Sequence, residues 1–364
     1  MSPTERIPAW ALAYDSGDHP PFAYTADVLG LTVDGAAGAL DVLLIERGGE
    51  PFRGRVAVPG GFVAWEGDET ARDAALRELR EETGVGEPDY IEVLDTYDAN
   101  GRDPRQFAGR LVAGRFVRRG NRVVSRTDLA LFRDRHRARP TAGDDAAKAF
   151  WAPVGRYLPW EDIRSERGRA ARDRVTAALD TSPAAADDDW AVRVAKAFGP
   201  RLDDWNEERA GERLRLMIRA GVVEEALRDR WGQLPDDAAP LPGSGEAMAF
   251  DHRLMLADAL GRLRGKIKYV PELLVALTPP LFTIAGLQGV VELIAGRPLE
   301  AANFRRLLAH SKHHALIRPT GSTTESGGRP AELFTWRRDY AHERLERSLR
   351  LPWLPLDKNR PPVI

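Results

Sequence analysis

The segment Pro59–Val85 constrains the fold more than any other part of the chain, because it joins a Gly-Gly turn to a clearly marked helix. Thr70 and Asp73 form a capping-box-like pair at the start of the predicted helix, and Gly84 is typical of a helix end. The pattern therefore predicts a strand that leaves through the turn, followed by a helix over Thr70–Glu82.

The predicted helix carries three carboxylates on one face. They stand at positions i, i+3 and i+4, so the helical repeat brings them within reach of a common point: Glu78, Glu81 and Glu82. Like charges at this spacing repel one another, and a cation between them relieves the repulsion; oxygen ligands suit Mg²⁺ or Mn²⁺. A solvated helix with Glu–Arg pairs is the alternative. The neighbouring turn, cap and stop residues favour the metal site.

Composition excludes several other kinds of site. The chain has 364 residues and no cysteine, so disulfides, thiolate nucleophiles and cysteine-ligated metal centres are excluded. The formal net charge is -2 and 43% of the residues are hydrophobic, which is enough apolar material for two or three domains. The near-neutral charge argues against nucleic acid binding over the whole surface, while a local basic face stays open.

No segment has the pattern of a secretory signal or of a membrane span. The first residues lack the basic and apolar regions of a signal peptide. The longest uncharged stretch, Leu273–Val291, is interrupted by Pro279-Pro280, so we expect two separate elements with a break. The sequence therefore predicts a cytoplasmic protein without a membrane partner.

The first part of the chain alternates strand-like runs with the one strong helix. Apolar, partly β-branched runs predict five strands: Tyr24–Val33, Leu40–Arg47, Tyr90–Thr96, Arg110–Arg118 and Val123–Phe132. The residues Arg119-Gly120-Asn121 predict a hairpin turn between the last two strands. Strands around a helix indicate a mixed α+β domain that ends near Pro159.

Two regions of different texture follow. Trp160–Glu246 is rich in Ala, Arg, Asp and Glu and predicts helices joined by loops, with no motif that reveals its role. After it, the apolar spacing predicts three helices and a returning strand: Phe250–Tyr269, Phe282–Ala295, Ala301–Lys312 and Ala331–Trp336. Three helices followed by two strands around a polar loop are typical of a winged helix. The proline-rich end predicts an extended tail.

The segment with the three carboxylates resembles the Nudix box. That pattern has a glycine, five residues, a glutamate, seven residues and then Arg-Glu-apolar-x-Glu-Glu-x-Gly-apolar. Arg77–Val85 matches the second part throughout, and seven residues separate Glu69 from Arg77. Seven residues instead of five separate Gly61 from Glu69, so a two-residue insertion leaves the placement of Glu69 open. The resemblance implies a Nudix α/β/α sandwich with a mixed sheet.

The same resemblance implies the attack of a metal-activated water on a diphosphate. The catalytic residues that it implies are Glu69, Arg77, Glu78 and Glu82. The metal ligands that it implies for Mg²⁺ or Mn²⁺ are Gly61, Glu78, Glu81 and Glu82. The general base stays open between Glu82 and an acid of a distant loop. Asp144 and Asp145 are the candidates there, and simple turn residues are the alternative.

The flanks of the box and the C-terminal region resemble ADP-ribose pyrophosphatases and the Nudix-related transcriptional regulators (NrtR-like). The matching segments include Leu43–Arg47, Asp103–Arg105, Arg122–Ser125, Phe250–His252, Gly296–Leu299, Asn303–Arg306 and Gly327–Ala331. Those regulators repress NAD-metabolism or sugar-utilisation genes and sense ADP-ribose or a related nucleotide. The resemblance implies a homodimer that binds double-stranded DNA. We expect the small molecule to contact Arg47, Phe62, Arg105, Asp144 and Asp145.

Local charge agrees with a DNA contact, because residues 246–338 hold 13 Lys and Arg against 8 Asp and Glu. The candidate DNA contacts are Arg305, Arg306, Lys312 and Arg329. Against this, the predicted recognition helix follows the acidic Glu300, and dimerisation or packing is the alternative role. The predicted organisation is an N-terminal arm (1–21), a Nudix domain (22–159), a helical insertion or linker (160–248), a winged helix (249–338) and a tail (339–364).

Three functions stay open at this point. The intact set of acids favours a metal-dependent hydrolase of ADP-ribose or a related nucleoside diphosphate derivative, fused to a winged helix. The alternative is a repressor whose Nudix domain senses the nucleotide without hydrolysing it and whose winged helix binds DNA. A protein with both activities is the third hypothesis.

Overall fold

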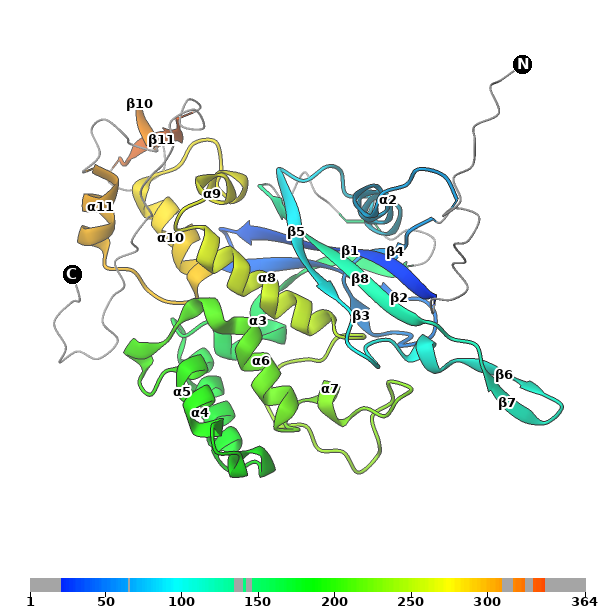
Figure 1. Ribbon diagram of the computed structural model, residues 1–364. Helices are drawn as coiled ribbons and strands as arrows, with labels where there is room; N and C mark the ends of the chain where they lie inside the picture. Colours follow the sequence, from blue (N-terminus) through cyan, green and yellow to red (C-terminus); the bar gives the residue numbers. More distant parts are fainter. Residues whose placement is uncertain are drawn as a thin grey trace, which may run out of the picture.

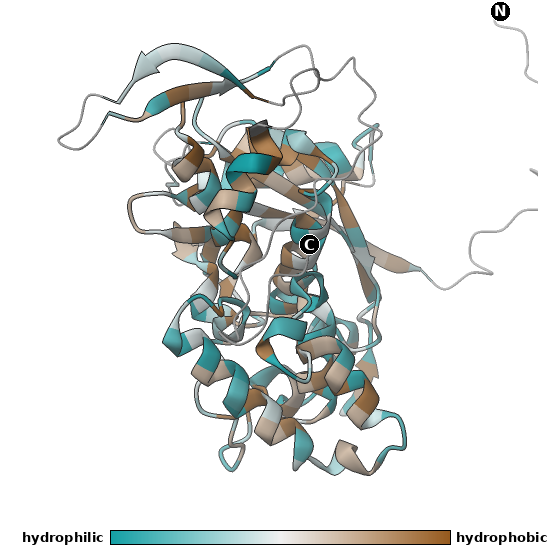
Figure 2. Ribbon diagram, turned by 90° about the vertical axis from the view of Figure 1, so that its left-hand side faces the viewer, coloured by the Kyte–Doolittle hydropathy of each residue, from teal (hydrophilic) through white to brown (hydrophobic). Residues whose placement is uncertain are grey.

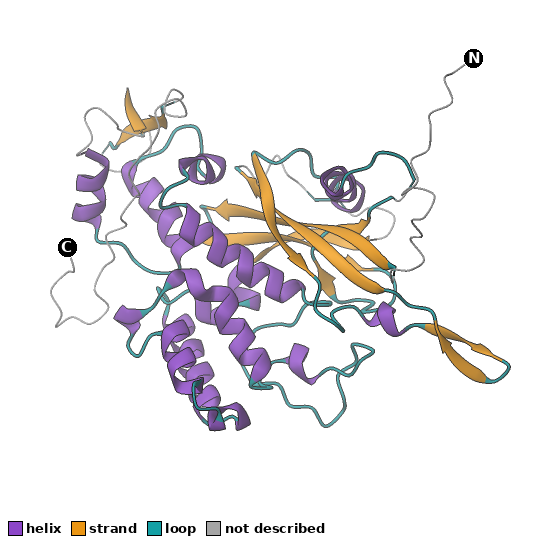
Figure 3. Ribbon diagram, viewed as in Figure 1, coloured by secondary structure: helices purple, strands orange, loops and turns teal. Residues whose placement is uncertain are grey.

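The computed structural model describes residues 21–64, 66–133, 140–141, 146–309, 317–324 and 330–337. Within these residues a central mixed sheet lies between helix α2 on one face and a group of helices on the other, and a small unit of helices and a hairpin lies at one end (Figures 1 and 3). The predicted α+β class and the α/β/α sandwich are confirmed.

Seven strands form the central sheet. Five follow one another across it: β3 (Val56–Ala57), β2 (Ala39–Arg47), β1 (Phe22–Asp34), β8 (Arg122–Phe132) and β5 (Tyr90–Tyr97). Two more join from the sides: β4 (Gly60–Phe62) pairs with β1, and β9 (Ala146–Pro153) pairs with β2. Strands β1 and β8 run parallel, and the other pairs are antiparallel. The central strands are covered on both faces, which explains their nearly continuous apolar sequences.

Alternation along β1 divides its side chains between two cores. Ala26 and Val28 pack with Leu79 of α2 (Ala71–Thr83) in the smaller core. Leu29 and Leu31 belong to the larger core, which continues into the helices on the opposite face. Burying each such side chain stabilises the fold by about 1.5–3 kcal/mol. The two faces of one strand therefore pack helix α2 and the helical layer against the same sheet.

The helical layer is built from residues 154–266. Its helices are α3 (Val154–Tyr157), α4 (Glu166–Asp180), α5 (Trp190–Phe198), α6 (Ala210–Arg219), α7 (Glu224–Leu227) and α8 (His252–Lys266). Hydrophilic and hydrophobic residues alternate along the helices of the molecule (Figure 2). Helix α4 buries one face, whereas most residues of α8 are buried. The expected helices between Trp160 and Glu246 are confirmed. Helix α8 packs on α6, β1 and β5, so it joins this layer to the sheet.

The C-terminal unit contains three helices and a hairpin: α9 (Pro271–Leu277), α10 (Ile284–Ala295), α11 (Ala301–Ala309), β10 (Ile317–Thr323) and β11 (Glu332–Trp336). The backbones of Phe282 and Phe334 exchange two hydrogen bonds of 3.0 and 2.7 Å, which hold the hairpin against the chain before α10. The predicted break at Pro279-Pro280 is confirmed. No helix in the described part of the chain is long and apolar enough to span a bilayer.

Two predicted elements are wrong in their extent. The helix predicted over Phe250–Tyr269 is shorter, because Phe250 has a φ of 50° and Pro271 starts a new helix. The strand predicted over Arg110–Arg118 is a separate hairpin of β6 (Gly109–Val112) and β7 (Arg115–Arg118), and it does not pair with β8. Its two-residue turn closes because Ala113 and Gly114 both have positive φ values, of 48° and 76°.

Candidate functional site

Helix α2 positions the acidic residues because both of its ends are fixed. The side chain of Thr70 accepts a hydrogen bond from the backbone N–H of Asp73, whose carboxylate accepts one from the N–H of Thr70. At the other end Gly84 has a φ of 65°, and its N–H donates to the carbonyl of Arg80 at 2.9 Å. Such a cap stabilises a helix by about 1 kcal/mol. The predicted caps are therefore confirmed.

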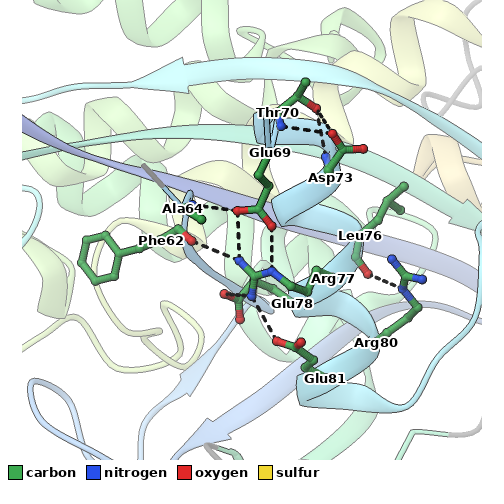
Figure 4. A network of polar contacts seen from close by, with 10 residues as sticks. All are labelled: Phe62, Ala64, Glu69, Thr70, Asp73, Leu76, Arg77, Glu78, Arg80 and Glu81. Carbon is green, nitrogen blue, oxygen red and sulfur yellow. Dashed lines mark hydrogen bonds and ion pairs between the residues drawn. The ribbon is translucent and has the colours of Figure 1, made fainter. Parts of the chain in front are cut away.

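Glu69 connects the loop before α2 to the helix itself (Figure 4). One carboxylate oxygen accepts from the backbone N–H of Ala64 at 2.7 Å, and the other accepts from Arg77 Nε at 2.8 Å. Arg77 Nη2 also donates to the carbonyl of Phe62 at 3.2 Å. The hydrogen bonds from Arg77 and Ala64 hold the pKa of Glu69 below its ordinary value. The inserted loop thus still brings Glu69 to Arg77.

Arg77 also binds two of the three carboxylates on the helix face. Its Nη1 lies 2.8 Å from Glu78 Oε1 and 3.0 Å from Glu81 Oε2 (Figure 4). One guanidinium therefore contacts three acids, Glu69, Glu78 and Glu81. These contacts raise the pKa of Arg77, and the hydrogen bond to Glu69 has the largest effect. The side chain of Glu81 is 60% exposed, so only Glu78 faces the inside of the site.

Glu82 lies deeper and has a different partner. One of its oxygens accepts a hydrogen bond of 2.8 Å from the backbone N–H of Gly60, and only 9% of the residue is exposed. Burial is the largest of the causes that together raise the pKa of Glu82 to about 8; Glu78 and Asp27 also raise it, whereas the Gly60 hydrogen bond and the charge of Arg47 act to lower it. The positive charge of Arg47 therefore does not outweigh the burial of this carboxyl group.

The three carboxylates do not converge as their spacing predicts. Among the described residues no group of three or more His, Asp or Glu side chains lies close enough to hold a metal ion. The reason is local: Arg77 draws Glu78 and Glu81 together on one side, and Gly60 holds Glu82 on the other. The argument that unpaired acids on this helix require a cation therefore fails for Glu78 and Glu81.

The donor set still fits a divalent cation at one point. A Cβ built on Gly61 would lie 2.1 Å from Glu78 Oε1, so only a glycine lets the chain approach this carboxylate so closely. Glu78, Glu82 and the Gly61 carbonyl offer the hard oxygen ligands that Mg²⁺ and Mn²⁺ prefer. The raised pKa of Glu82 also marks a carboxyl group whose anionic form a cation would stabilise.

Gly60 and Gly61 belong to strand β4, which pairs with β1, so the turn predicted at these glycines is wrong. A pocket opens beside them, and we call it the arginine pocket. Twelve residues line it: Thr25, Asp27, Arg47, Val58, Gly60, Gly61, Phe62, Arg102, Asp103, Arg105, Phe250 and His252. Three of the expected substrate contacts are in this set, namely Arg47, Phe62 and Arg105. The other two, Asp144 and Asp145, lie outside the described residues. The pocket therefore joins strand β4 of the carboxylate site to a basic wall.

Guanidinium and aromatic groups alternate along that basic wall. Arg105 lies 4.8 Å from the ring centroid of Phe62 and 5.4 Å from that of Phe250, and Arg47 lies 4.9 Å from Phe250. Burial lowers the pKa of Arg47, and the like charge of Arg105 lowers it further. Two arginines in such proximity suit an anionic ligand such as a phosphate, while the rings suit a flat or apolar group.

Sequence reasoning missed the part of the pocket that comes from the start of α8. Asp251 forms a two-pronged ion pair with Arg102, with distances of 2.7 and 2.9 Å. His252 Nδ1 accepts a hydrogen bond of 3.1 Å from the backbone N–H of Val58. Burial and the nearby arginines lower the pKa of His252 well below its ordinary value, so the ring is neutral. These residues matched the regulators in sequence, but nothing in the pattern located them at the pocket.

Asp27 is a second residue that the sequence analysis missed. It is 6% exposed and accepts a hydrogen bond from the hydroxyl of Ser125. Burial raises its pKa to about 6, and a Cβ on Gly60 would lie 2.1 Å from its Oδ1. Gly60 thus runs between Asp27 and Glu82. The available signal was an aspartate inside a strand that is otherwise apolar.

The C-terminal unit holds the expected DNA contacts that can be described. Arg305 and Arg306 are exposed on α11, whereas Phe304 is buried against the rest of the unit. Glu300 accepts hydrogen bonds from two backbone N–H groups at the start of this helix, so the acidic residue before it serves as a cap. Lys312 and Arg329 lie outside the described residues.

Comparison with known families identifies two domains. Residues 23–179 match the NUDIX domain, and residues 274–336 match the NrtR DNA-binding winged helix domain. The first match continues past residue 159 into α4, and the second begins inside α9, after α8. The predicted domain boundaries stay predictions.

Individual relatives agree with this combination of two domains. The ADPR responsive transcriptional repressor NtrR of Acinetobacter baylyi is 24% identical over 326 residues, which cover 90% of this chain and 86% of that protein. The ADP-ribose pyrophosphatase of Methanocaldococcus jannaschii is 47% identical over 64 residues, 18% of this chain and 36% of that enzyme. A crystal structure of a MutT/nudix family protein from Enterococcus faecalis shares the fold, with 22% identity, 90% and 91% coverage and a TM-score of 0.50.

Proposed function

The chain combines a Nudix domain with an NrtR-type DNA-binding winged-helix domain, and from this premise we propose that it is a transcriptional regulator controlled by a nucleotide. The proposed ligand of the arginine pocket is ADP-ribose or a related nucleoside diphosphate derivative. The proposed partner of the winged helix is double-stranded DNA, contacted by Arg305, Arg306, Lys312 and Arg329. The similarity to an ADPR-responsive repressor over 90% of the chain supports this proposal. A homodimer in the cytoplasm is part of it.

The observation that carries the proposal is that residues leading into α8 line the pocket. Phe250 packs against Arg47 and Arg105, and Asp251 is paired with Arg102. Phe250 also holds a φ of 50°, a conformation that costs a non-glycine residue about 1–3 kcal/mol and that clusters at functional sites. A ligand that binds between the two arginines must contact the start of this helix.

The other end of α8 is fixed to the C-terminal unit. Arg264 Nε donates a hydrogen bond of 2.8 Å to the carbonyl of Ile294, near the end of α10. The same guanidinium donates to the main chain of Glu161 at 2.8 Å and pairs with its carboxylate. A shift of α8 at the pocket is therefore transmitted to α10, on which α11 packs. This chain of contacts supports control of the winged helix by the pocket.

The pocket chemistry supports a diphosphate-containing ligand with an aromatic group. Arg47 and Arg105 supply charge-assisted donors for phosphate oxygens. Phe62 is 47% exposed at the edge of the pocket, so its ring is available to stack on a base.

A binding assay tests this regulator. DNA from the protein's own promoter region is titrated with the protein in the presence and absence of ADP-ribose, in buffer with EDTA to prevent turnover. We expect ADP-ribose to change the DNA affinity by about 5- to 150-fold, the usual range of allosteric coupling. Phe250→Ala should reduce this change, whereas the exposed Asp173→Asn should not. An affinity that ADP-ribose leaves unchanged would contradict nucleotide control.

A second candidate function is hydrolysis, which the complete Nudix helix favours. Hydrolysis would add water across the diphosphate of ADP-ribose and release AMP and ribose 5-phosphate. A bound Mg²⁺ or Mn²⁺ supplies an activated water and neutralises phosphate charge. In this proposal Gly61, Glu78 and Glu82 hold the ion, and Arg77 with Glu69 orients Glu78.

AMP release with Mg²⁺ tests the hydrolase. Wild type should release AMP, and both Glu78→Gln and Glu82→Gln should reduce the rate at least tenfold. The proton acceptor is Glu82 or an acid of the loop with Asp144 and Asp145, so Asp144→Asn with Asp145→Asn separates the two. No release of AMP by the wild type would leave the regulator as the sole function.

A further inference from the structure

We propose that the hairpin of β6 and β7 is a second DNA-binding element. With its flanking residues it forms a segment that we call the arginine arm (residues 107–122). This arm lies outside the residues that match the winged helix, and it projects from the opposite end of the molecule (Figure 1). The proposal rests on the proposed DNA partner of this protein and extends the contact to the end of the molecule away from the described residues of the winged helix (Figure 1).

The charge of the arm fits a polyanion. It holds five arginines and no acidic residue: Arg110, Arg115, Arg118, Arg119 and Arg122. Arg118 and Arg122 donate to the main-chain carbonyls of Gln106 and Asp98, and within the described structure none of the five has a carboxylate partner. These charges are therefore available to phosphates, and each arginine that neutralises a phosphate adds to salt-dependent affinity.

The shape of the arm fits a groove of duplex DNA. Cross-strand pairing puts Leu111 opposite Phe116, and these two side chains are 72% and 56% exposed on one face of the ribbon. The opposite face carries Arg110 and Arg115 together with Val112 and Val117, which are 42% and 40% exposed, and the alternation puts Arg118 on the face of Leu111. A two-stranded ribbon is narrow enough to enter a groove. Arginines next to apolar side chains that wedge between bases are typical of proteins that bind the minor groove.

The base of the arm is anchored, so its direction is fixed. The backbone N–H groups of Arg119 and Gly120 both donate to the carbonyl of Ala108 at 2.8 Å. Phe107 lies under Arg118 and contacts Trp231 edge-to-face. An isolated two-stranded hairpin is only marginally stable in water, and these contacts hold it in an extended position.

A protein partner is the competing occupant, and the arm suits it less well. A stable interface buries about 800 Å² on each partner and is depleted in charge at its centre. The arm exposes four large apolar side chains, Leu111, Val112, Phe116 and Val117, and they are interleaved with five arginines instead of forming a charge-free centre. The charge therefore favours DNA over a second copy of this chain.

The salt dependence of DNA binding tests the arm. Fluorescence anisotropy measures the affinity of the full-length protein for a long mixed-sequence duplex over a range of KCl concentrations. The arm variant replaces Arg110, Arg115 and Arg119 with Gln. The control replaces three exposed cations of α4 and α5 with Gln, Arg167, Arg174 and Lys196, and so makes the same charge change. Loss of phosphate contacts lowers the slope of log K against log salt by about 0.9 for each contact.

We expect the slope to fall by about 1–3 in the arm variant and to stay unchanged in the control. Leu111→Ser with Phe116→Ser should weaken binding without changing the slope. Equal slopes for wild type and the arm variant would overturn the proposal. The proposal would also be overturned if the arm variant sediments with a lower mass than the wild type and this dissociation accounts for its loss of DNA affinity. That result would assign the arm to a protein interface.

Failure of the arm and failure of the proposed regulator are distinguishable. Arg305→Gln with Arg306→Gln alters the winged helix alone. If this variant loses affinity while the arm variant keeps the full slope, the winged helix binds DNA and the arm does not. If the wild type binds no duplex at low salt, both proposals fail together.

Discussion

Glu82 and Glu161 are both buried carboxylates, and they differ in the positive charge around them. Burial acts to raise the pKa of Glu161, but Arg213 and Arg264 outweigh it and hold that pKa below the ordinary value. Glu82 accepts a hydrogen bond from the N–H of Gly60 and has Glu78 and Asp27 as acidic neighbours; the charge of Arg47 does not outweigh burial, and the pKa of Glu82 rises to about 8. The comparison separates a buried acid whose charge is fully paired within the fold from one whose charge is not, and the second kind is common at functional sites.

The Glu161 cluster lies where several elements meet. Arg213 of α6 binds its carboxylate at 2.7 Å and also donates to the carbonyl of Ala197 at 2.7 Å. Arg264 of α8 binds the same carboxylate and the carbonyl of Ile294. Every charge is paired, and no ligand is required. The pocket at the other end of α8 has the opposite character, because its acids and arginines are only partly paired.

Glu161→Gln should produce the largest loss of stability. Gln removes the negative charge but leaves Arg213 and Arg264 buried at 0% and 2% side-chain exposure. Breaking a buried ion pair on one side typically costs about 3–5 kcal/mol. Urea unfolding at neutral pH measures this loss. As a control, Glu212→Gln removes an ion pair of exposed side chains and should cost under about 1 kcal/mol. A cost below about 1 kcal/mol for Glu161→Gln would contradict a structural role for the cluster.

The second largest effect should come from a divalent metal bound at the site of Glu82. Mn²⁺ should stabilise the wild type by about 2.7 kcal/mol when its concentration is 100 times the dissociation constant. Glu78→Gln with Glu82→Gln should remove this stabilisation, because the carboxylate ligands beside Gly61 are lost. Thermal unfolding with and without Mn²⁺ gives the measurement. The exposed Glu87→Gln serves as the control, and a double variant that Mn²⁺ stabilises as much as the wild type would exclude this metal site.

The pH dependence of stability should follow from Glu82 in the absence of metal. Its pKa rises from 4.5 in the unfolded chain to about 8 in the folded one, so between these values the folded state keeps a proton that the unfolded state has lost. The stabilising contribution is therefore complete below pH 4.5 and is lost as the pH rises through 8. From pH 6 to pH 7 the wild type should lose about 1.4 kcal/mol more than Glu82→Gln. Urea unfolding in EDTA tests this, and parallel pH profiles would contradict the raised pKa.

The sequence correctly predicted the features that depend on residues close together along the chain. The caps of α2 and the break at Pro279-Pro280 follow from residues within one turn of the chain, and both are confirmed. The position of the acids on α2 was also predictable. Their convergence was not, because helix spacing fixes the backbone and leaves Arg77 free to bind Glu78 and Glu81.

Contacts between distant segments could not be predicted in the same way. Glu161 meets Arg213 across 52 residues and Arg264 across 103 residues. Arg102 meets Asp251 across 149 residues. Each pair depends on how the helical layer folds back onto the sheet, and no local spacing records that path.

Asp251→Asn, which changes the contact between the arginine pocket and the start of α8, should have the smallest effect of the variants discussed. The amide keeps one hydrogen bond to Arg102 and loses the charge, so we expect the coupling between ADP-ribose and DNA to fall by about 1 kcal/mol, or about fivefold. The measurement is the DNA affinity with and without ADP-ribose, compared with the exposed Asp173→Asn.

Reciprocity gives an independent check on the same variant. If ADP-ribose changes the DNA affinity by some factor, DNA must change the ADP-ribose affinity by that factor. Asp251→Asn should therefore reduce both effects equally, because it weakens the connection without removing either site. A reduction in only one direction would mean that the variant has damaged the pocket or the winged helix itself. In that case α8 would be a packing element, like the Glu161 cluster at its other end.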